Sequence, residues 1–304
     1  MDAPNGRADR PDPGRLAGAA FIVVIVVFAG LRLFEIGPWV LPAFDVYAYW
    51  ATRAGLDYAN AHPGATGAYL YSPAFAQVIA SLTALPWPVF AGLWTLLIAA
   101  PLPWLVGRFA IVLLLLPPVA MSVVLGQLDL LYAAVIVLGF RWPAVWVLPI
   151  LTKVTPGVGL LWFLVRREWR SLGIALGTTL AVALASAVLD PRAWRDWFQL
   201  LSRMEFPALG GGLWFLPVPL WIRLSLAAAL IAWGARTDRR WVLPVGVCLS
   251  LPTVWLNSPT ILVALLPLAG AGRPLAGAGR RTPRAAHPSD TARQAPIRSS
   301  VSPT

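Results

Sequence analysis

The sequence predicts an all-α integral membrane protein, a polytopic bundle of about ten helical spans. Three observations carry this prediction. Hydrophobic residues make up 58% of the 304 residues and charged residues only 12%, whereas charged residues run at about 25% in soluble proteins. The mean hydropathy is +0.70. Uncharged apolar stretches alternate along the chain with short arginine-bearing gaps, which is typical of helices that cross a bilayer.

The first span is expected from Leu16 to Phe34. Arginines at positions 7, 10 and 15 precede it, and no small-x-small cleavage pattern follows it. A basic flank before an uncleaved apolar run is typical of a signal anchor, so residues 1–15 are expected in the cytoplasm. The next interval, residues 35–71, mixes charged and aromatic residues. This mixture favours a structured outer loop with a short interfacial helix.

Further apolar stretches follow, several of them short. Residues 72–86 and 127–140, for example, are shorter than the bilayer core, which indicates tilted, re-entrant or half-spanning helices. With the first span, all the stretches form one polytopic domain over residues 16–270. They lie at residues 72–86, 88–107, 109–125, 127–140, 142–165, 171–189, 213–235, 241–256 and 258–270.

Arginine clusters set the predicted orientation. Residues 166–170, residues 236–240 and the tail at 271–304 are basic, and all three fall on the cytoplasmic side when the first residue is inside. We therefore expect a multi-pass protein of the plasma membrane, with both termini in the cytoplasm and with residues 35–71 and 190–212 outside. The tail is expected to be disordered.

The formal net charge of +11 follows from this distribution. The tail contains six arginines and one acidic residue, so much of the excess positive charge serves orientation and attraction to anionic membrane lipids. A nucleic-acid partner is therefore not expected. Cys248 is the only cysteine, which excludes an intramolecular disulfide and a thiolate metal cluster. With only two histidines, His62 and His287, neither a metal site nor a cofactor is predicted.

Proline is frequent within the apolar stretches, and the chain has 29 prolines. An interior proline removes a backbone donor and bends its helix, which lipid tolerates where protein or water satisfies the freed carbonyl. One interpretation is broken helices around a cavity, and the other is a composition generally rich in Ala, Gly, Pro and Arg. The 16 tryptophans lie mostly near span ends, as in an aromatic belt.

Ionisable residues at membrane depth cost about 2.5–3.5 kcal/mol on insertion scales, which makes them functional candidates. Asp45 lies just beyond the first span, and its alternative role is a helix cap. For Gln127 and Asp129 the alternative is hydrogen bonding between helices. Lys153 is the single lysine and lies in the middle of a predicted span. This position favours a buried anionic partner or a ligand phosphate over a structural ion pair.

Five short motifs follow one another in a fixed order. They are Phe44-Asp45-Val46-Tyr47, Tyr69-Leu70-Tyr71-Ser72-Pro73-Ala74-Phe75, Leu85-Pro86 with Ala91-Gly92-Leu93-Trp94, Gly126-Gln127-Leu128-Asp129-Leu130-Leu131, and Lys153-Val154-Thr155-Pro156. Over about residues 15–170 this series resembles that of glycosyltransferase family 87, membrane mannosyltransferases of the C-type superfamily that use polyprenyl-phosphate mannose. Two positions depart from the family pattern. The chain reads Tyr71-Ser72-Pro73 where the family commonly reads Tyr-Pro-Pro, and it has Asp129 where the family commonly has Asn.

The resemblance implies a C-type multi-helix fold and an inverting transfer of a hexose, mannose by family habit. The donor would be a polyprenyl-phosphate sugar and the acceptor a lipid or glycan outside the membrane. Asp45 is the candidate general base, and one carboxylate suffices because a phosphate leaving group needs charge neutralisation more than protonation. Arg53, Lys153, Arg192 and Arg195 are candidates for holding the phosphate. For the segment with Arg192 and Arg195, the alternative is an interfacial amphipathic helix.

Tyr47, Tyr71, Gln127 and Asp129 complete the candidate substrate-binding residues. The predicted topology places Gln127 toward the cytoplasmic end of its spans, away from the candidate base. Gln127 and Asp129 are therefore expected to make packing or donor-tail contacts, unless residues 109–140 form a re-entrant segment.

Two other classes of function stay open at this point. A transporter or lipid flippase is favoured by the proline-rich spans and the lone intramembrane lysine, and it predicts inverted halves, which the sequence does not display. A noncatalytic membrane scaffold predicts that the polar residues at positions 45, 127, 129 and 153 are individually replaceable.

Overall fold

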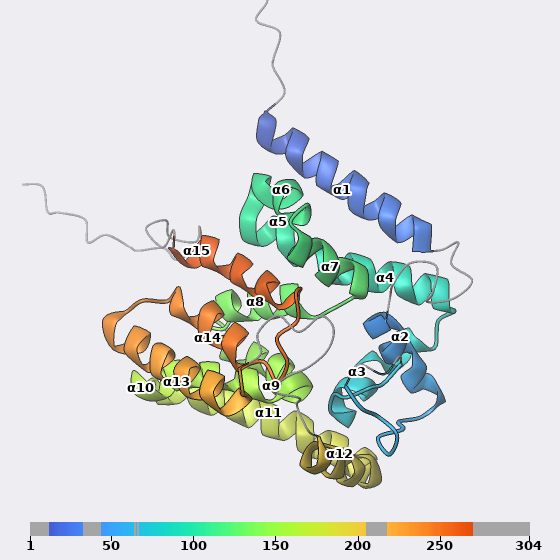
Figure 1. Cartoon of the computed structure of the whole chain (residues 1–304), viewed down its shortest axis with the longest axis vertical. Coiled ribbons are helices and arrows are strands. Elements are labelled where there is room, and N and C mark those ends of the chain that lie inside the picture. Colours follow the sequence, from blue (N-terminus) through green and yellow to red (C-terminus); the bar gives the residue numbers. More distant parts are fainter. Residues whose placement is uncertain (1–11, 33–43, 64, 66, 205–217, 270–304) are drawn as a thin grey trace, which may run out of the picture. The chain divides into compact units, whose positions relative to one another are not determined.

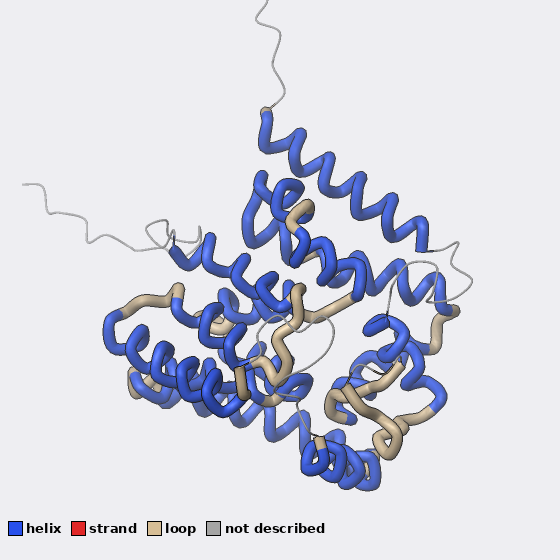
Figure 2. The backbone as a smooth tube through the Cα atoms, in the orientation of Figure 1, coloured by secondary structure: helices blue, strands red, loops and turns tan. Residues whose placement is uncertain are grey.

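The computed structural model describes residues 12–32, 44–63, 65, 67–204 and 218–269, and every regular element in these ranges is a helix (Figures 1 and 2). The all-α prediction is therefore confirmed for this part of the chain. The predicted tail at 271–304 lies outside the described residues, as do most of the N-terminal segment and parts of both outer loops.

The described helices fall into two runs along the sequence. The first comprises α1 (Pro13–Arg32), α2 (Phe44–Ala51), η1 (Thr52–Ala54), α3 (Pro73–Thr83), α4 (Trp87–Ala99), α5 (Pro101–Val106), η2 (Gly107–Phe109), α6 (Ala110–Leu114), α7 (Pro117–Leu125) and α8 (Asp129–Leu138). The second comprises η3 (Pro143–Trp146), α9 (Val147–Lys153), η4 (Thr155–Leu160), α10 (Leu161–Val165), α11 (Trp169–Leu189), α12 (Pro191–Arg203), α13 (Leu220–Thr237), α14 (Val242–Ser250), η5 (Ser258–Ala264) and α15 (Leu265–Ala269).

Three helical stretches in the described ranges are long and apolar enough to cross a membrane: Pro13–Leu31, Trp87–Leu114 and Trp169–Leu189. A fourth is added if α7 and α8, which are bent by 105° at their junction, count as one span. These helices agree with a membrane protein, but the predicted number of about ten spans is not confirmed. Further apolar helices are shorter, at Pro73–Thr83, Pro143–Lys153, Thr155–Val165 and Ser258–Ala269.

Several predicted spans have the wrong boundaries. The stretches expected at 88–107 and 109–125 are divided differently, because one apolar helical stretch runs from Trp87 to Leu114 and α7 begins only at Pro117. The stretch expected at 142–165 is broken after Lys153, and the one expected at 241–256 stops being helical at Ser250. Hydropathy marked apolar segments correctly, but it does not record where the backbone turns.

Prolines explain much of this segmentation. Helices α3, α7, η3 and α12 all have proline in their first turn, at Pro73, Pro117, Pro143 and Pro191. The first backbone N–H groups of a helix have no intrahelical partner, so proline costs no hydrogen bond there. Proline therefore begins short helices in these places, and Pro117 does so within the stretch at 109–125 that the sequence had suggested as one span.

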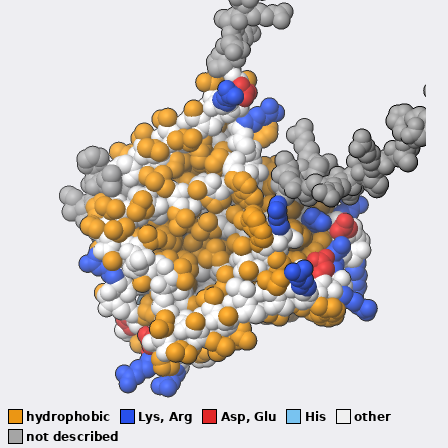
Figure 3. All heavy atoms as spheres, turned by 180° about the vertical axis from the view of Figure 1, so that it is seen from behind, with side chains coloured by type: hydrophobic (Ala, Val, Ile, Leu, Met, Phe, Trp, Pro, Cys, Tyr) orange, Lys and Arg blue, Asp and Glu red, His pale blue; other side chains and the backbone are white. Residues whose placement is uncertain are grey.

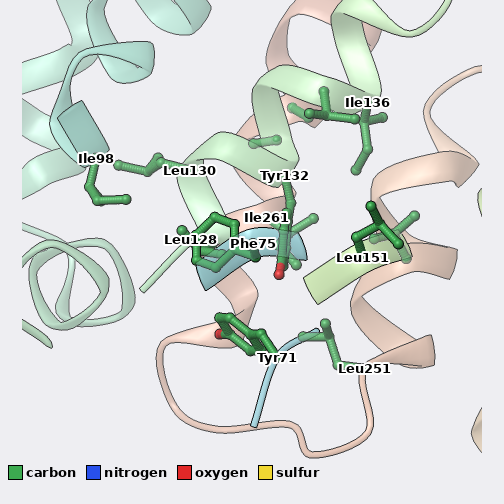
Figure 4. Packing of buried hydrophobic residues seen from close by; sticks show 14 of the residues in the cluster. Tyr71, Phe75, Ile98, Leu128, Leu130, Tyr132, Ile136, Leu151, Leu251 and Ile261 are labelled. Carbon is green, nitrogen blue, oxygen red and sulfur yellow. The ribbon is translucent and has the colours of Figure 1, made fainter. Parts of the chain in front are cut away.

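The core gathers side chains from helices that are far apart in the sequence. Figure 4 shows Phe75 of α3, Tyr132 of α8, Leu151 of α9 and Ile261 of η5 within one buried cluster. Helix α8 packs against η5, and α13 packs against α14. Hydrophobic side chains also spread over the centre and upper part of the face in Figure 3, while Lys and Arg gather in its right-hand part and at its edges. Apolar exposure on this scale marks a membrane-facing or partner-facing surface.

Candidate active site

Asp45 lies in the first turn of α2, the short helix that follows the first long apolar helix. Its side chain is partly buried, and Oδ2 accepts a hydrogen bond of 2.6 Å from Nε2 of Gln127. The partner comes from the α7–α8 junction, far along the chain. The carboxylate thus faces a group from another part of the bundle.

The α7–α8 junction explains how Gln127 reaches Asp45. Gly126 ends α7 in the left-handed conformation, with φ 76°. The N–H of Gln127 bonds to Ser122 O at 2.9 Å, as in a Schellman motif. Trp94 of α4 donates from Nε1 to Gly126 O at 3.0 Å. The chain then turns by 105° into α8. The prediction that Gln127 lies away from the candidate base is therefore wrong, because it assumed straight spans. The bend fits the exception made in that prediction, a re-entrant segment within residues 109–140.

Substituting Gly126 with Ala is expected to separate Gln127 from Asp45. A Cβ at this position would overlap Val46 Cγ2 of α2 and would lie 3.2 Å from Trp94 Cδ1. The positive φ adds strain for any residue with a Cβ. We expect a loss of unfolding free energy of about 1–3 kcal/mol, together with lower activity. Thermal unfolding in detergent and a transfer assay measure the two effects.

Gly177→Ala is the matched control, since Gly177 lies within α11 and a Cβ there meets no atom within 4 Å. This variant is expected to be as stable as the native protein or slightly more stable, because alanine favours a helix over glycine. Equal stability and activity for the two variants would contradict the role given to Gly126.

Asp129 carries the most deeply buried charge of the site, with a fully buried side chain in the first turn of α8. Its Oδ2 accepts 2.6 Å from Nδ2 of Asn257 and 3.3 Å from Oγ of Ser122. Nζ of Lys153 lies 3.9 Å from the other oxygen, Oδ1. Asp129 therefore bonds neighbouring helices and also provides a buried anionic partner for Lys153.

Lys153 is the last residue of α9 and its side chain is 14% exposed. The ammonium lies 5.5 Å from the centre of the Tyr132 ring, whose hydroxyl is 2.7 Å from Thr152 Oγ1. The next residue, Val154, has φ 56° and ψ −62°, which is strained for a β-branched side chain. Such strain costs about 1–3 kcal/mol and collects at functional sites. Here it ends α9 directly beside the lysine.

The charges of these side chains act on one another. Burial raises the pKa of Asp45 from 3.8 to about 6. The positive charge of Lys153 lowers this pKa, the negative charge of Asp129 raises it, and the Gln127 hydrogen bond lowers it. A carboxyl group with this pKa is roughly nine-tenths ionised at pH 7 and can still take up a proton readily. Asp45 therefore has the properties of a general base.

The tyrosines among the predicted residues line the aromatic packing around α2. Tyr49 donates from its hydroxyl to that of Tyr71 at 3.2 Å, and both side chains are buried. Tyr47 packs edge-on against Trp87, with ring centres 5.8 Å apart. Arg53 is exposed and its guanidinium lies 4.2 Å from the centre of the Trp50 ring. These contacts surround the helix that carries Asp45.

The second predicted outer loop forms the amphipathic helix α12. Its buried side includes Trp194 and Trp197, and Trp197 donates from Nε1 to Leu70 O at 3.1 Å. Arg192 and Arg195 lie on its exposed side. The structure thus brings Asp45, Gln127, Asp129 and Lys153 together, whereas Arg53, Arg192 and Arg195 lie on exposed surfaces.

Two residues that bond Asp129 were not identified from the sequence. Asn257 is 2% exposed and Ser122 is fully buried, and both bond Asp129. The only signal for Asn257 was a polar amide between apolar stretches, and nothing related it to a residue so distant in the chain. In the described part of the chain, no three His, Cys, Asp or Glu side chains gather where they could hold a metal ion.

Comparison with known proteins gives one family. The family model described as glycosyltransferase family 87 matches residues 69–259. This range includes Gln127, Asp129, Lys153 and Asn257, and Asp45 precedes it. No curated protein and no solved structure matches the chain.

Proposed function

The chain belongs to glycosyltransferase family 87, and on that premise we propose a specific reaction for this membrane glycosyltransferase. It transfers a hexose, mannose, from a polyprenyl-phosphate donor to a lipid or glycan acceptor, with inversion at the sugar. Transfer takes place on the extracytoplasmic side of the plasma membrane, and both termini are cytoplasmic. The observation that carries the proposal is the Asp45 carboxylate, partly buried, bonded to Gln127 and within the field of Lys153.

In the proposed step, Asp45 accepts the proton of the acceptor hydroxyl as its oxygen attacks the anomeric carbon. The bond between that carbon and the phosphate oxygen breaks, and the polyprenyl phosphate leaves with the electron pair. Gln127 occupies Oδ2 of Asp45, so Oδ1 is the oxygen that faces the hydroxyl. The Gln127 amide thereby orients the carboxylate and leaves Oδ1 to accept the proton.

The leaving phosphate needs a cation, and Lys153 is the candidate cation whose charge acts on Asp45. An ammonium 3.9 Å from Asp129 Oδ1 is attracted to the carboxylate but is beyond ordinary hydrogen-bond length. Asp129 therefore does not take up its donors, and in the proposal they bind the phosphate that develops negative charge. Tyr47 and Tyr71 line the sugar site in this proposal, and the exposed Arg53 attracts the anionic donor.

The proposal is tested with purified protein in proteoliposomes, supplied with polyprenyl-phosphate mannose labelled in the sugar and with a membrane glycolipid fraction as acceptor. We expect label in the acceptor and none when a nucleotide sugar replaces the lipid-linked donor. Movement of the intact labelled donor across the bilayer without covalent transfer would instead support a flippase.

The pH dependence of kcat/KM is expected to show an acidic limb near pH 6. Asp45 acts as a base only when ionised, so the rate falls about tenfold per pH unit below its pKa of about 6. Asp129→Asn removes a charge that raises this pKa and shifts the limb to lower pH. Lys153→Met removes a charge that lowers it and shifts the limb to higher pH. A limb that neither variant moves would contradict the assignment of the base to Asp45.

A further inference from the structure

A buried arginine fixes the turn that delivers Asn257 to the site. Arg223 of α13 is 4% exposed. Its guanidinium donates to four carbonyls, those of Val218 at 2.8 Å, Leu249 at 2.8 Å, Leu251 at 2.6 Å and Pro252 at 2.9 Å. Leu249 lies in the last turn of α14, and Leu251 and Pro252 lie in the turn after it, which leads into Asn257 before η5. Arginine suits this task because its planar fork presents five donors in fixed directions.

The two oxygens of Asp129 have different surroundings. Oδ2 is occupied by Asn257 and Ser122, whereas Oδ1 has no hydrogen-bond partner in the described structure and faces Lys153 at 3.9 Å. The short bond from the Asn257 amide takes up much of the carboxylate's demand for donors. Without it, a fully buried carboxylate would draw in the nearest cation. That cation is Lys153.

We propose that Asn257 is a positioning residue that keeps Lys153 available to the donor phosphate by holding Asp129, and that Arg223 acts through Asn257. The inference rests on the proposed role of Lys153 in phosphate binding. It extends the site to the C-terminal half of the chain, to a residue that touches neither Lys153 nor Asp45 in the contacts described. Asn257 thus determines how strongly Asp129 attracts the ammonium of Lys153.

The test compares the KM for donor and acceptor in Asn257→Leu, which keeps the branched shape and the number of side-chain heavy atoms but removes both N–H donors. We expect the donor KM to rise about tenfold or more, as for loss of a hydrogen bond to a charged group, and the acceptor KM to stay unchanged. Ser122→Ala removes the longer bond to the same oxygen and is expected to have a smaller effect. Arg223→Met is expected to resemble Asn257→Leu, and Arg223→Lys to retain part of the donor affinity.

Rescue distinguishes positioning from a purely structural role. In Asn257→Leu/Asp129→Asn, residue 129 has no charge with which to capture Lys153, so the donor KM is expected to return to within about threefold of the native value. A structural role would lower the yield and thermal stability of folded protein and leave both KM values unchanged. Failure of the second substitution to restore the donor KM would also overturn the proposal.

Lys153→Met separates this inference from the proposed function. If Lys153→Met raises the donor KM and Asn257→Leu does not, the positioning role is overturned and the role of Lys153 stands. If neither variant changes the donor KM, the phosphate role of Lys153 fails and the positioning role fails with it.

Discussion

Asp45→Asn is expected to lower the rate of sugar transfer by about 10²–10⁴-fold, the usual contribution of a general base. The asparagine keeps the shape of the side chain and can still accept the hydrogen bond from Gln127 Nε2. It cannot accept the proton of the acceptor hydroxyl. The loss should appear in kcat, with little change in the donor KM, because the base acts in the transition state. Single-turnover transfer from labelled polyprenyl-phosphate mannose measures it.

Stability provides an independent check on the same variant. Burial raises the pKa of Asp45 above 3.8, so folding disfavours the ionised carboxylate at pH 7. Replacing it with a neutral amide is expected to leave the Tm unchanged or to raise it. Asp196→Asn, which removes an exposed carboxylate from α12, is the matched control and should transfer sugar at the native rate. Asp45→Asn protein that is folded and retains more than about a tenth of the native rate would exclude Asp45 as the base.

The sequence predicted the helical class and the candidate polar residues, but not how the chain brings them together. Composition is sufficient to predict the class, because soluble proteins rarely have 58% hydrophobic and only 12% charged residues. The meeting of Asp45 with Gln127 depends on the 105° turn between α7 and α8. Gly126 carries the local signal for that turn, since glycine at a helix end favours the left-handed cap. A hydropathy pattern averages over many residues, so it does not reveal a turn that depends on this single glycine.

The same limit explains why Asn257 and Arg223 were missed. Asn257 is one polar residue between two apolar stretches and Arg223 is one within such a stretch. Asn257 acts through a contact far along the chain, and Arg223 through a contact with the turn after α14. Lys153 was identified because a lone intramembrane cation is costly, but its partner Asp129 was identified separately and for a different reason. The free-energy cost of a charge in the membrane identifies the charged residues from the sequence, whereas only the packing of the helices shows which of them pair.

Lys153→Met is expected to have two effects that a second substitution can separate. The first is on stability, because the variant leaves the fully buried Asp129 without its cation. Removing one partner of a buried pair costs about 3–5 kcal/mol, and the lower figure suits a pair 3.9 Å apart with one partner still slightly exposed. The second effect is on the donor, whose phosphate loses its cation, so kcat/KM should fall about 100-fold or more.

Lys153→Met/Asp129→Asn removes both charges and places at position 129 the residue that the family pattern commonly has. Most of the lost unfolding free energy should return, because no buried carboxylate remains uncompensated. Transfer should not return, because the phosphate still has no cation. If the double variant recovers activity together with stability, Lys153 serves only to neutralise Asp129, and the phosphate must be held by other groups. If stability returns and transfer stays low, the lysine acts on the substrate, and neutralising Asp129 is not its whole role.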